Sequence, residues 1–137
     1  MKNRPFTIFL LPLLLLGPSQ TFADAVSKGR DHFLKQCIGC HAFSCNRDSN
    51  EAYAPRLGGL FGRKVGGLDD FSGYSEGFKN SQIIWTDETL DEFFKDPGEI
   101  DPESIMADKG KIEDAEHRRE IIAFLKTEDP TMNLFCP

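Results

Sequence analysis

Two cysteines and a histidine lie close together in the first third of the chain, in the order Cys37-Ile38-Gly39-Cys40-His41. Thiols three residues apart near a helix end lie on the same side, and the adjacent imidazole can reach in the same direction. This spacing is typical of haem c attachment, in which two thiols bind one porphyrin and the histidine binds its iron. The pattern predicts one haem c, with Cys37 and Cys40 as covalent links and His41 as an iron ligand.

The same cysteines allow two other kinds of site. The chain has four of them, Cys37, Cys40, Cys45 and Cys136. All four, or three with His41, could form a tetrahedral zinc site. A C-x-x-C pair could also be a redox dithiol, although a thioredoxin-like site follows a strand and these residues are expected in a helix. We therefore favour haem over zinc and over thiol redox chemistry.

A low-spin electron-transfer haem needs a second strong axial ligand. Met106 stands in a loop before the last expected helix, where the chain can cross the open face of the haem, and Met132 stands in a polar tail. His32 and His117 are rivals, but each lies among charged residues of an expected helix and is expected to face water. The residues alone favour Met106.

The first 23 residues have the character of a secretory signal peptide. Two basic residues precede an apolar run over 6–16, and cleavage is expected after Ala23 or Ala25. The run is too short to cross a bilayer, so the mature protein is expected to have no membrane span. These features predict export to the periplasm, where a disulfide can persist.

The remaining residues, 24–137, are expected to form one domain with a C-terminal tail at 127–137. A formal charge of −6 argues against nucleic-acid binding, which needs a clustered basic surface. Only 39% of the whole chain is hydrophobic, so a bulky apolar ligand is expected to complete the core.

Three segments have helical patterns, at about 25–40, from Thr86 as N-cap to a stop at Pro97, and at about 114–126. The first segment carries apolar Val26, Phe33 and Leu34, and the second places Leu90, Phe93 and Phe94 on one face. The third presents Ile121, Ile122 and Leu125 toward a core. The side chains expected to face water on the last helix are Arg118, Arg119 and Glu120. The stretches at 42–85 and 96–113 have no sustained period, which predicts long loops that wrap a ligand.

From about residue 28 to residue 125 the chain resembles class I c-type cytochromes, small soluble electron carriers. Residues 54–63 (APRLGGLFGR) resemble the family's Pro-x-Leu-x-Gly-x-x-Gly-Arg stretch. Gly29 and Phe33 match positions that pack the first helix on the last. The resemblance implies the all-α cytochrome c fold, in which three main helices and long loops surround one covalently bound haem.

The resemblance also implies roles for single residues. The spacing from Tyr74 through Trp85 to Met106 matches the mitochondrial proteins without a gap, which makes Met106 the second iron ligand. The Pro55 carbonyl would accept the Nδ1–H of His41. Side chains at four matching positions would face a haem propionate, namely Arg63, Tyr74, Trp85 and Ser104.

Three features depart from the family pattern. Phe93 replaces a tyrosine that bonds the methionine sulfur in mitochondrial relatives, which predicts a higher reduction potential, and Phe78 replaces an asparagine that orders a buried water. Cys45 and Cys136 are additional, and we expect a disulfide between them that stabilises the fold by about 4 to 5 kcal/mol. Residues 24–86 carry eight bases and seven acids, whereas 87–137 carry six bases and fifteen acids.

These features together predict a monomeric periplasmic electron carrier that is not an enzyme. Its redox protein partners are expected to carry a basic docking patch, because the acids surround Met106 where mitochondrial relatives have lysines. The alternative is a dedicated haem c subunit or electron acceptor of a periplasmic dehydrogenase or oxidase complex. Peroxidase activity and gas sensing are disfavoured because both axial positions are expected to be filled.

Overall fold

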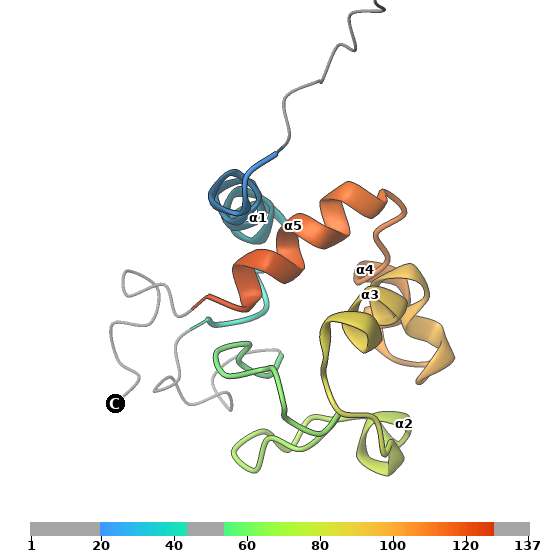
Figure 1. Cartoon of the computed structure of the whole chain (residues 1–137). Helices are drawn as coiled ribbons and strands as arrows, with labels where there is room; N and C mark the ends of the chain where they lie inside the picture. The colour runs from blue at the N-terminus through green and yellow to red at the C-terminus, as the bar shows by residue number, and fades with distance from the viewer. Residues whose placement is uncertain (1–19, 44–53, 128–137) are drawn as a thin grey trace, which may run out of the picture.

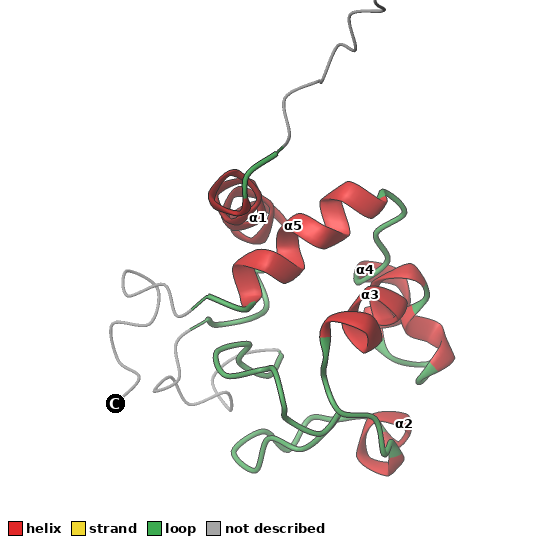
Figure 2. Ribbon diagram, viewed as in Figure 1, coloured by secondary structure: helices red, strands yellow, loops and turns green. Residues whose placement is uncertain are grey.

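The computed structural model describes residues 20–43 and 54–127. Within these two ranges, helices and loops make up the chain and no strand is named (Figure 2). The helices in chain order are α1 (Phe22–Gln36), α2 (Glu76–Asn80), α3 (Asp87–Lys95), the 3-10 helix η2 (Pro97–Glu99), α4 (Ile105–Lys109) and α5 (Ala115–Leu125). This architecture agrees with the expected all-α fold.

α1 and α5 cross at a steep angle: Figure 1 views α1 almost along its axis, while α5 runs across the picture. Gly29 lies at the crossing, where an added Cβ atom would be 1.8 Å from the backbone oxygen of Glu120. Only glycine allows so close an approach. Phe33 and Phe124 are fully buried nearby, with ring centroids 5.4 Å apart. The packing expected of Gly29 and Phe33 is therefore confirmed.

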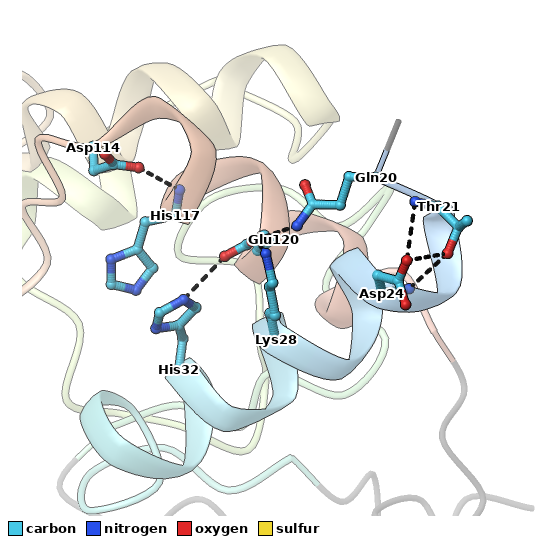
Figure 3. Close-up of polar contacts among 8 residues, drawn as sticks. All are labelled: Gln20, Thr21, Asp24, Lys28, His32, Asp114, His117 and Glu120. Carbon is cyan, nitrogen blue, oxygen red and sulfur yellow. Dashed lines mark hydrogen bonds and ion pairs between the residues drawn. The ribbon is translucent and has the colours of Figure 1, made fainter. Parts of the chain in front are cut away.

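A polar cluster joins the same two helices along one edge (Figure 3). Glu120 accepts hydrogen bonds from Gln20 Nε2 at 2.8 Å and pairs with His32 Nε2 at 3.0 Å and Lys28 Nζ at 3.3 Å. The His32 and His117 rings face each other with centroids 3.6 Å apart. Both histidines were expected to face water, but they are half-buried, because each ring covers part of the other.

The side chains of α5 correct a second prediction. Arg119 is exposed as expected, but Arg118 and Glu120 are only 6% and 4% exposed. Helix periodicity accounts for both, because position 118 shares a face with Ile121 and Ile122, and position 120 lies one turn before the buried Phe124. Their charges are compensated by partners rather than by water.

α3 and α5 begin where their caps predict. The Thr86 side chain accepts the N–H of Thr89, and the Asp114 side chain accepts the N–H of His117 at 2.7 Å. α3 ends at Lys95, ahead of the proline at 97. The core side chains expected on these helices are buried, namely Leu90, Phe93, Phe94, Ile121, Ile122 and Leu125.

α1 differs from the predicted range of 25–40 at both ends. It begins at Phe22 because Thr21 and Asp24 form a reciprocal capping box, and it ends at Gln36. On α1, Leu34 is 37% exposed, whereas Phe33 is fully buried. Cleavage after Ala23 or Ala25 would fall within the first turns of this helix, and it stays a prediction. None of the helices in the described part of the chain has the length and apolar composition needed to cross a bilayer.

Short helices interrupt the stretches expected to be loops. α2 and α4 have five residues each, too few for a periodic pattern. Tertiary contacts support them: Asp101 Oδ2 accepts the N–H of Gly77 at 3.0 Å, which ties the segment before α4 to α2. Met106 therefore lies on α4 rather than in an irregular loop.

Candidate functional site

The two cysteines of the C-x-x-C-H motif lie in a turn that follows α1. The N–H groups of Cys40 and His41 both donate to the Cys37 carbonyl, at 3.0 and 2.8 Å. Both thiols are free, with Cys37 half-buried and Cys40 exposed. Burial, and to a lesser degree Cys40, raises the pKa of Cys37 to about 11. A thiol that stays protonated at neutral pH argues against a redox dithiol, which needs a stabilised thiolate.

His41 is held in one orientation. Its Nδ1 lies 2.7 Å from the Pro55 carbonyl oxygen, and because that oxygen can only accept, Nδ1 carries the hydrogen. Burial lowers the pKa of His41 and outweighs the opposing effect of this bond, so the ring is neutral at physiological pH. The contact implied for Pro55 is thus present, and Nε2 keeps its lone pair for a metal.

Three side chains expected near a propionate gather in one region. Gly62 N–H donates to the Trp85 carbonyl at 2.9 Å and Trp85 N–H to the Arg63 carbonyl at 3.0 Å, so residues 62–63 and 85 are adjacent. Burial lowers the pKa of Arg63, and Tyr74 opposes the shift; burial raises the pKa of Tyr74, and Arg63 opposes it. These mutual effects place Tyr74 close to the guanidinium.

The Arg63 guanidinium is already partly bound by the backbone. Its Nη2 donates to the Arg56 carbonyl at 2.9 Å and Nη1 weakly to the Gly58 carbonyl at 3.4 Å. These bonds leave other guanidinium hydrogens available, since the group has five donors. A half-buried cation with spare donors fits a carboxylate such as a haem propionate.

Met106 lies on α4, where its side chain packs half-buried against the hydrophobic core. Its N–H donates to Ser104 Oγ at 3.2 Å, and its carbonyl accepts the Gly110 N–H at 2.9 Å. An added Cβ at Gly110 would be 2.9 Å from the Met106 carbonyl oxygen, a backbone atom, so a side chain there would force a shift of the helix end. Ser104 is therefore the N-cap of α4, a role that residue types alone did not indicate. The hydroxyl can still donate to another group.

An aromatic cluster contains the two phenylalanines that depart from the family pattern. Phe93 packs edge-on against Trp85, with centroids 5.1 Å apart, and against Phe78 at 5.9 Å. Phe78 in turn stacks on Tyr74 at 6.3 Å. The apolar cluster therefore connects the region of Trp85 and Tyr74 with α3.

Three remaining candidates, Cys45, Cys136 and Met132, lie outside the described residues. Among residues 20–43 and 54–127, no group of three histidines, cysteines or acids is arranged to hold a metal ion. The site brings together a paired thiol turn, an oriented imidazole and a half-buried cation, which fit the thioether links, iron and propionate of haem c.

Comparison with known proteins agrees with this site, although no family model matches the chain. The chain is 41% identical to cytochrome c of Tetrahymena pyriformis over 101 residues, which cover 74% of this chain and 86% of that protein. It is 35% identical to cytochrome c of Gibberella zeae over 101 residues, covering 74% and 92%.

A bacterial relative is matched over a longer stretch. Cytochrome c2 of Blastochloris viridis is 34% identical over 119 residues, which cover 87% of this chain and 90% of that protein. Together, these matches and the thiol–imidazole geometry show that the chain belongs to the cytochrome c family: it is a small electron carrier, not an enzyme, with one covalently attached haem c.

Proposed function

We propose that the protein is an exported carrier in which thioethers from Cys37 and Cys40 hold the haem and His41 and Met106 bind its iron. The observation that carries this is the 2.7 Å contact between His41 Nδ1 and the Pro55 carbonyl, which leaves Nε2 of the C-x-x-C-H histidine available to the iron. The bound haem supplies the Fe(II)/Fe(III) couple, and a thioether ligand favours Fe(II).

The chain's own residues orient the ligands and stabilise charge. Pro55 fixes the His41 ring and raises its basicity as a ligand. Arg63, Tyr74 and Trp85 donate to a propionate that would otherwise be a poorly compensated buried charge. Ser104, through its free hydroxyl hydrogen, adds a fourth donor. The aromatic cluster around Phe93 excludes water from this side of the core.

The ligand set is tested by paired methionine variants of the oxidised holoprotein. Met106→Leu should abolish the charge-transfer absorption that marks an iron–thioether bond and give a high-spin spectrum. Met132→Leu is the control and should leave both unchanged. A wild-type spectrum without that absorption, or its loss in the Met132 variant, would contradict the assignment.

We propose export to the periplasm because the segment 1–23 has signal-peptide character and cytochrome c2 proteins are among the relatives. Relatives from eukaryotes are also present, so location needs its own experiment. Mass analysis of the mature protein from a periplasmic fraction should give a start after Ala23 or Ala25. A full-length mass in the cytoplasm would exclude export.

The Cys45–Cys136 disulfide is proposed from the residues alone. The two thiols that remain after haem attachment should pair in an oxidising compartment. Non-reducing mass analysis of the holoprotein should detect no alkylatable thiol. Two alkylated cysteines would exclude the bridge.

We propose that the acidic segment around Met106 is the docking face and that the protein works as a monomer. Its acids at 96, 99, 103, 108, 113 and 114 are exposed. Attraction to a basic partner raises the association rate and weakens with salt. Glu103→Lys should slow electron transfer at low salt, whereas the control Glu76→Lys, an 80% exposed side chain on α2, should not.

The partner itself decides between a free carrier and a dedicated subunit. A pull-down from native periplasm with oxidised and reduced protein should recover transient redox partners in low yield. Stable co-purification with one dehydrogenase or oxidase would favour the subunit role instead.

A further inference from the structure

Arg118 is a buried charge that the haem site described above does not use. Its side chain, on α5, is 7% exposed, and its guanidinium points to two other segments of the chain. Nε donates to Asp91 Oδ1 on α3 at 2.7 Å. Nη1 donates to two successive backbone carbonyls, Ile112 at 2.9 Å and Glu113 at 2.7 Å.

Those carbonyls end the segment that carries Met106. The Ile112 N–H also donates to the Phe94 carbonyl on α3, at 2.7 Å. Ile112 therefore has its N–H held by α3 and its carbonyl held by Arg118. Five residues, 107–111, separate this anchor from Met106, and the first three of them belong to α4. Such a short connection transmits the position of the anchor to Met106.

Between residues 100 and 109 the Met106 segment has no fully buried residue, although Ile100 and Met106 pack half-buried against the core. None of the residues of α4 is buried, and Ile105 is 76% exposed. At the other end of the segment, the bond from the Gly77 N–H to Asp101 is only partly buried. A segment with little buried surface opens at low free-energy cost, so a single buried anchor strongly influences how often it opens.

The charge and shape of arginine suit this anchor. Asp91 compensates the buried cation and also pairs with Lys95 at 2.6 Å, and hydrogen bonds from Lys95 and then Arg118 hold the pKa of Asp91 below its ordinary value. Arginine can bond a carboxylate and two carbonyls at once because its donors form a planar fork, whereas a lysine ammonium is a compact point charge on a shorter reach.

We propose that Arg118 is a positioning residue for the second iron ligand: by holding residues 112–113 against α3, it limits how readily Met106 leaves the iron and admits an external ligand. This inference rests on the His41/Met106 ligation proposed above. Arg118 itself touches neither the iron nor the Met106 side chain; it acts through the backbone that connects them.

The test is a titration of the oxidised holoprotein with imidazole, in which the loss of the iron–thioether absorption measures binding. Imidazole replaces Met106 only when the methionine is displaced, so the apparent affinity reports the cost of opening. Arg118→Lys should raise that affinity about tenfold. The control Arg119→Lys changes the neighbouring exposed arginine in the same way and should leave the affinity unchanged.

General destabilisation needs a separate control. Ile121→Val deletes a methyl group from the fully buried core between α1 and α5. It should lower the urea midpoint without a matching rise in imidazole affinity. If Ile121→Val raises the affinity as much as Arg118→Lys at equal loss of stability, Arg118 has no specific role and the inference is overturned.

If the Arg118→Lys protein does not bind haem, a second variant tests the same inference. Asp91→Asn keeps the carbonyl bonds but removes the charge that holds Arg118, and it should raise imidazole affinity about threefold. An affinity equal to wild type would overturn the inference. Absence of the thioether absorption in wild-type protein would instead refute the ligand assignment, so the two failures are distinguishable.

Discussion

The helix pair α1–α5 and the α3–η2–α4 region hold their proposed haem ligands in different ways. α1 and α5 meet without a gap at Gly29 and bury Phe33, Ile121 and Phe124 completely. α4, which carries Met106, has no fully buried residue: Met106 packs half-buried against the core, and a few polar anchors hold the segment on either side. The thiol and His41 side is thus attached to a close-packed platform, whereas the Met106 side is attached by hydrogen bonds that can open separately.

The largest expected effect comes from breaking the platform at its crossing. Gly29→Val should reduce the free energy of unfolding by at least about 3 kcal/mol, because its side chain would overlap the Glu120 backbone and force the helices apart. Urea unfolding of the holoprotein measures this. Ser27→Ala, at an exposed position of the same helix, is the control. Equal stability of Gly29→Val and wild type would show that the crossing is adaptable.

A smaller loss is expected from the polar edge of the same platform. Glu120→Ala should reduce the free energy of unfolding by about 2 kcal/mol, since Lys28 and His32 lose their shared acceptor. Glu116→Ala removes an exposed acid from the same helix and should change stability little. If the two variants unfold at the same urea concentration, the platform depends on its apolar face alone.

On the Met106 side, the same approach tests the dry aromatic cluster. Phe93→Tyr places a hydroxyl among Trp85 and Phe78, and a bond from it to the methionine sulfur should lower the reduction potential. The expected change in global stability is within about 1 kcal/mol. Voltammetry measures the potential. An unchanged potential would show that no such bond forms and that the phenylalanine does not raise the potential.

The smallest expected effect is a pH dependence confined to the platform. Burial and the facing His32 lower the pKa of His117, whereas Asp114 and Glu120 oppose the shift. The unfolded chain therefore binds this proton more readily, and stability is lost as pH falls below about 6.5, the ordinary histidine value. Urea midpoints between pH 7 and pH 5 should fall less steeply in His117→Gln. Parallel slopes for variant and wild type would exclude a contribution from this histidine.

Below pH 5, protonation of Glu120 is expected to lower the stability of the fold further. Burial alone would raise its pKa, but bonds from Gln20, Lys28 and His32 together lower it. Stability from this carboxylate is present above the ordinary glutamate pKa of about 4.5 and is lost as pH falls further. Four other charged groups lie around His117 and Glu120. They are Asp31 and Lys35 on α1, the α5 cap Asp114, and Glu116 on α5.

The parts of the fold that were predictable depend on local signals. Thr86 and Asp114 are caps whose side chains act within three residues, so α3 and α5 begin where expected. The start of α1 was missed because Thr21 and Asp24 lie where signal-peptide character dominates the pattern. α2 and α4 were missed because their stability comes from distant contacts, such as Asp101 with Gly77, rather than from their five residues.

The site residues also divide into those that a local motif predicts and those that depend on contacts between distant segments. The C-x-x-C-H motif is local and predicts its own chemistry, and Pro55 followed from the family resemblance. The adjacency of Arg63 and Trp85 depends on backbone bonds across more than twenty residues, which no spacing rule indicates. Arg118 was assigned to water because its charge was weighted above its position on the apolar face of α5, although that periodicity was readable.

The long separation of α1 and α5 along the chain has a consequence for biogenesis. His32 and Glu120 are hydrogen-bonded although 88 positions apart, so the platform is a high-contact-order structure. During synthesis or export, α1 has no partner until nearly the whole chain has emerged. The Cys37 and Cys40 thiols therefore stay on an unfinished fold for that interval, which is the period in which enzymes that attach haem can reach both of them.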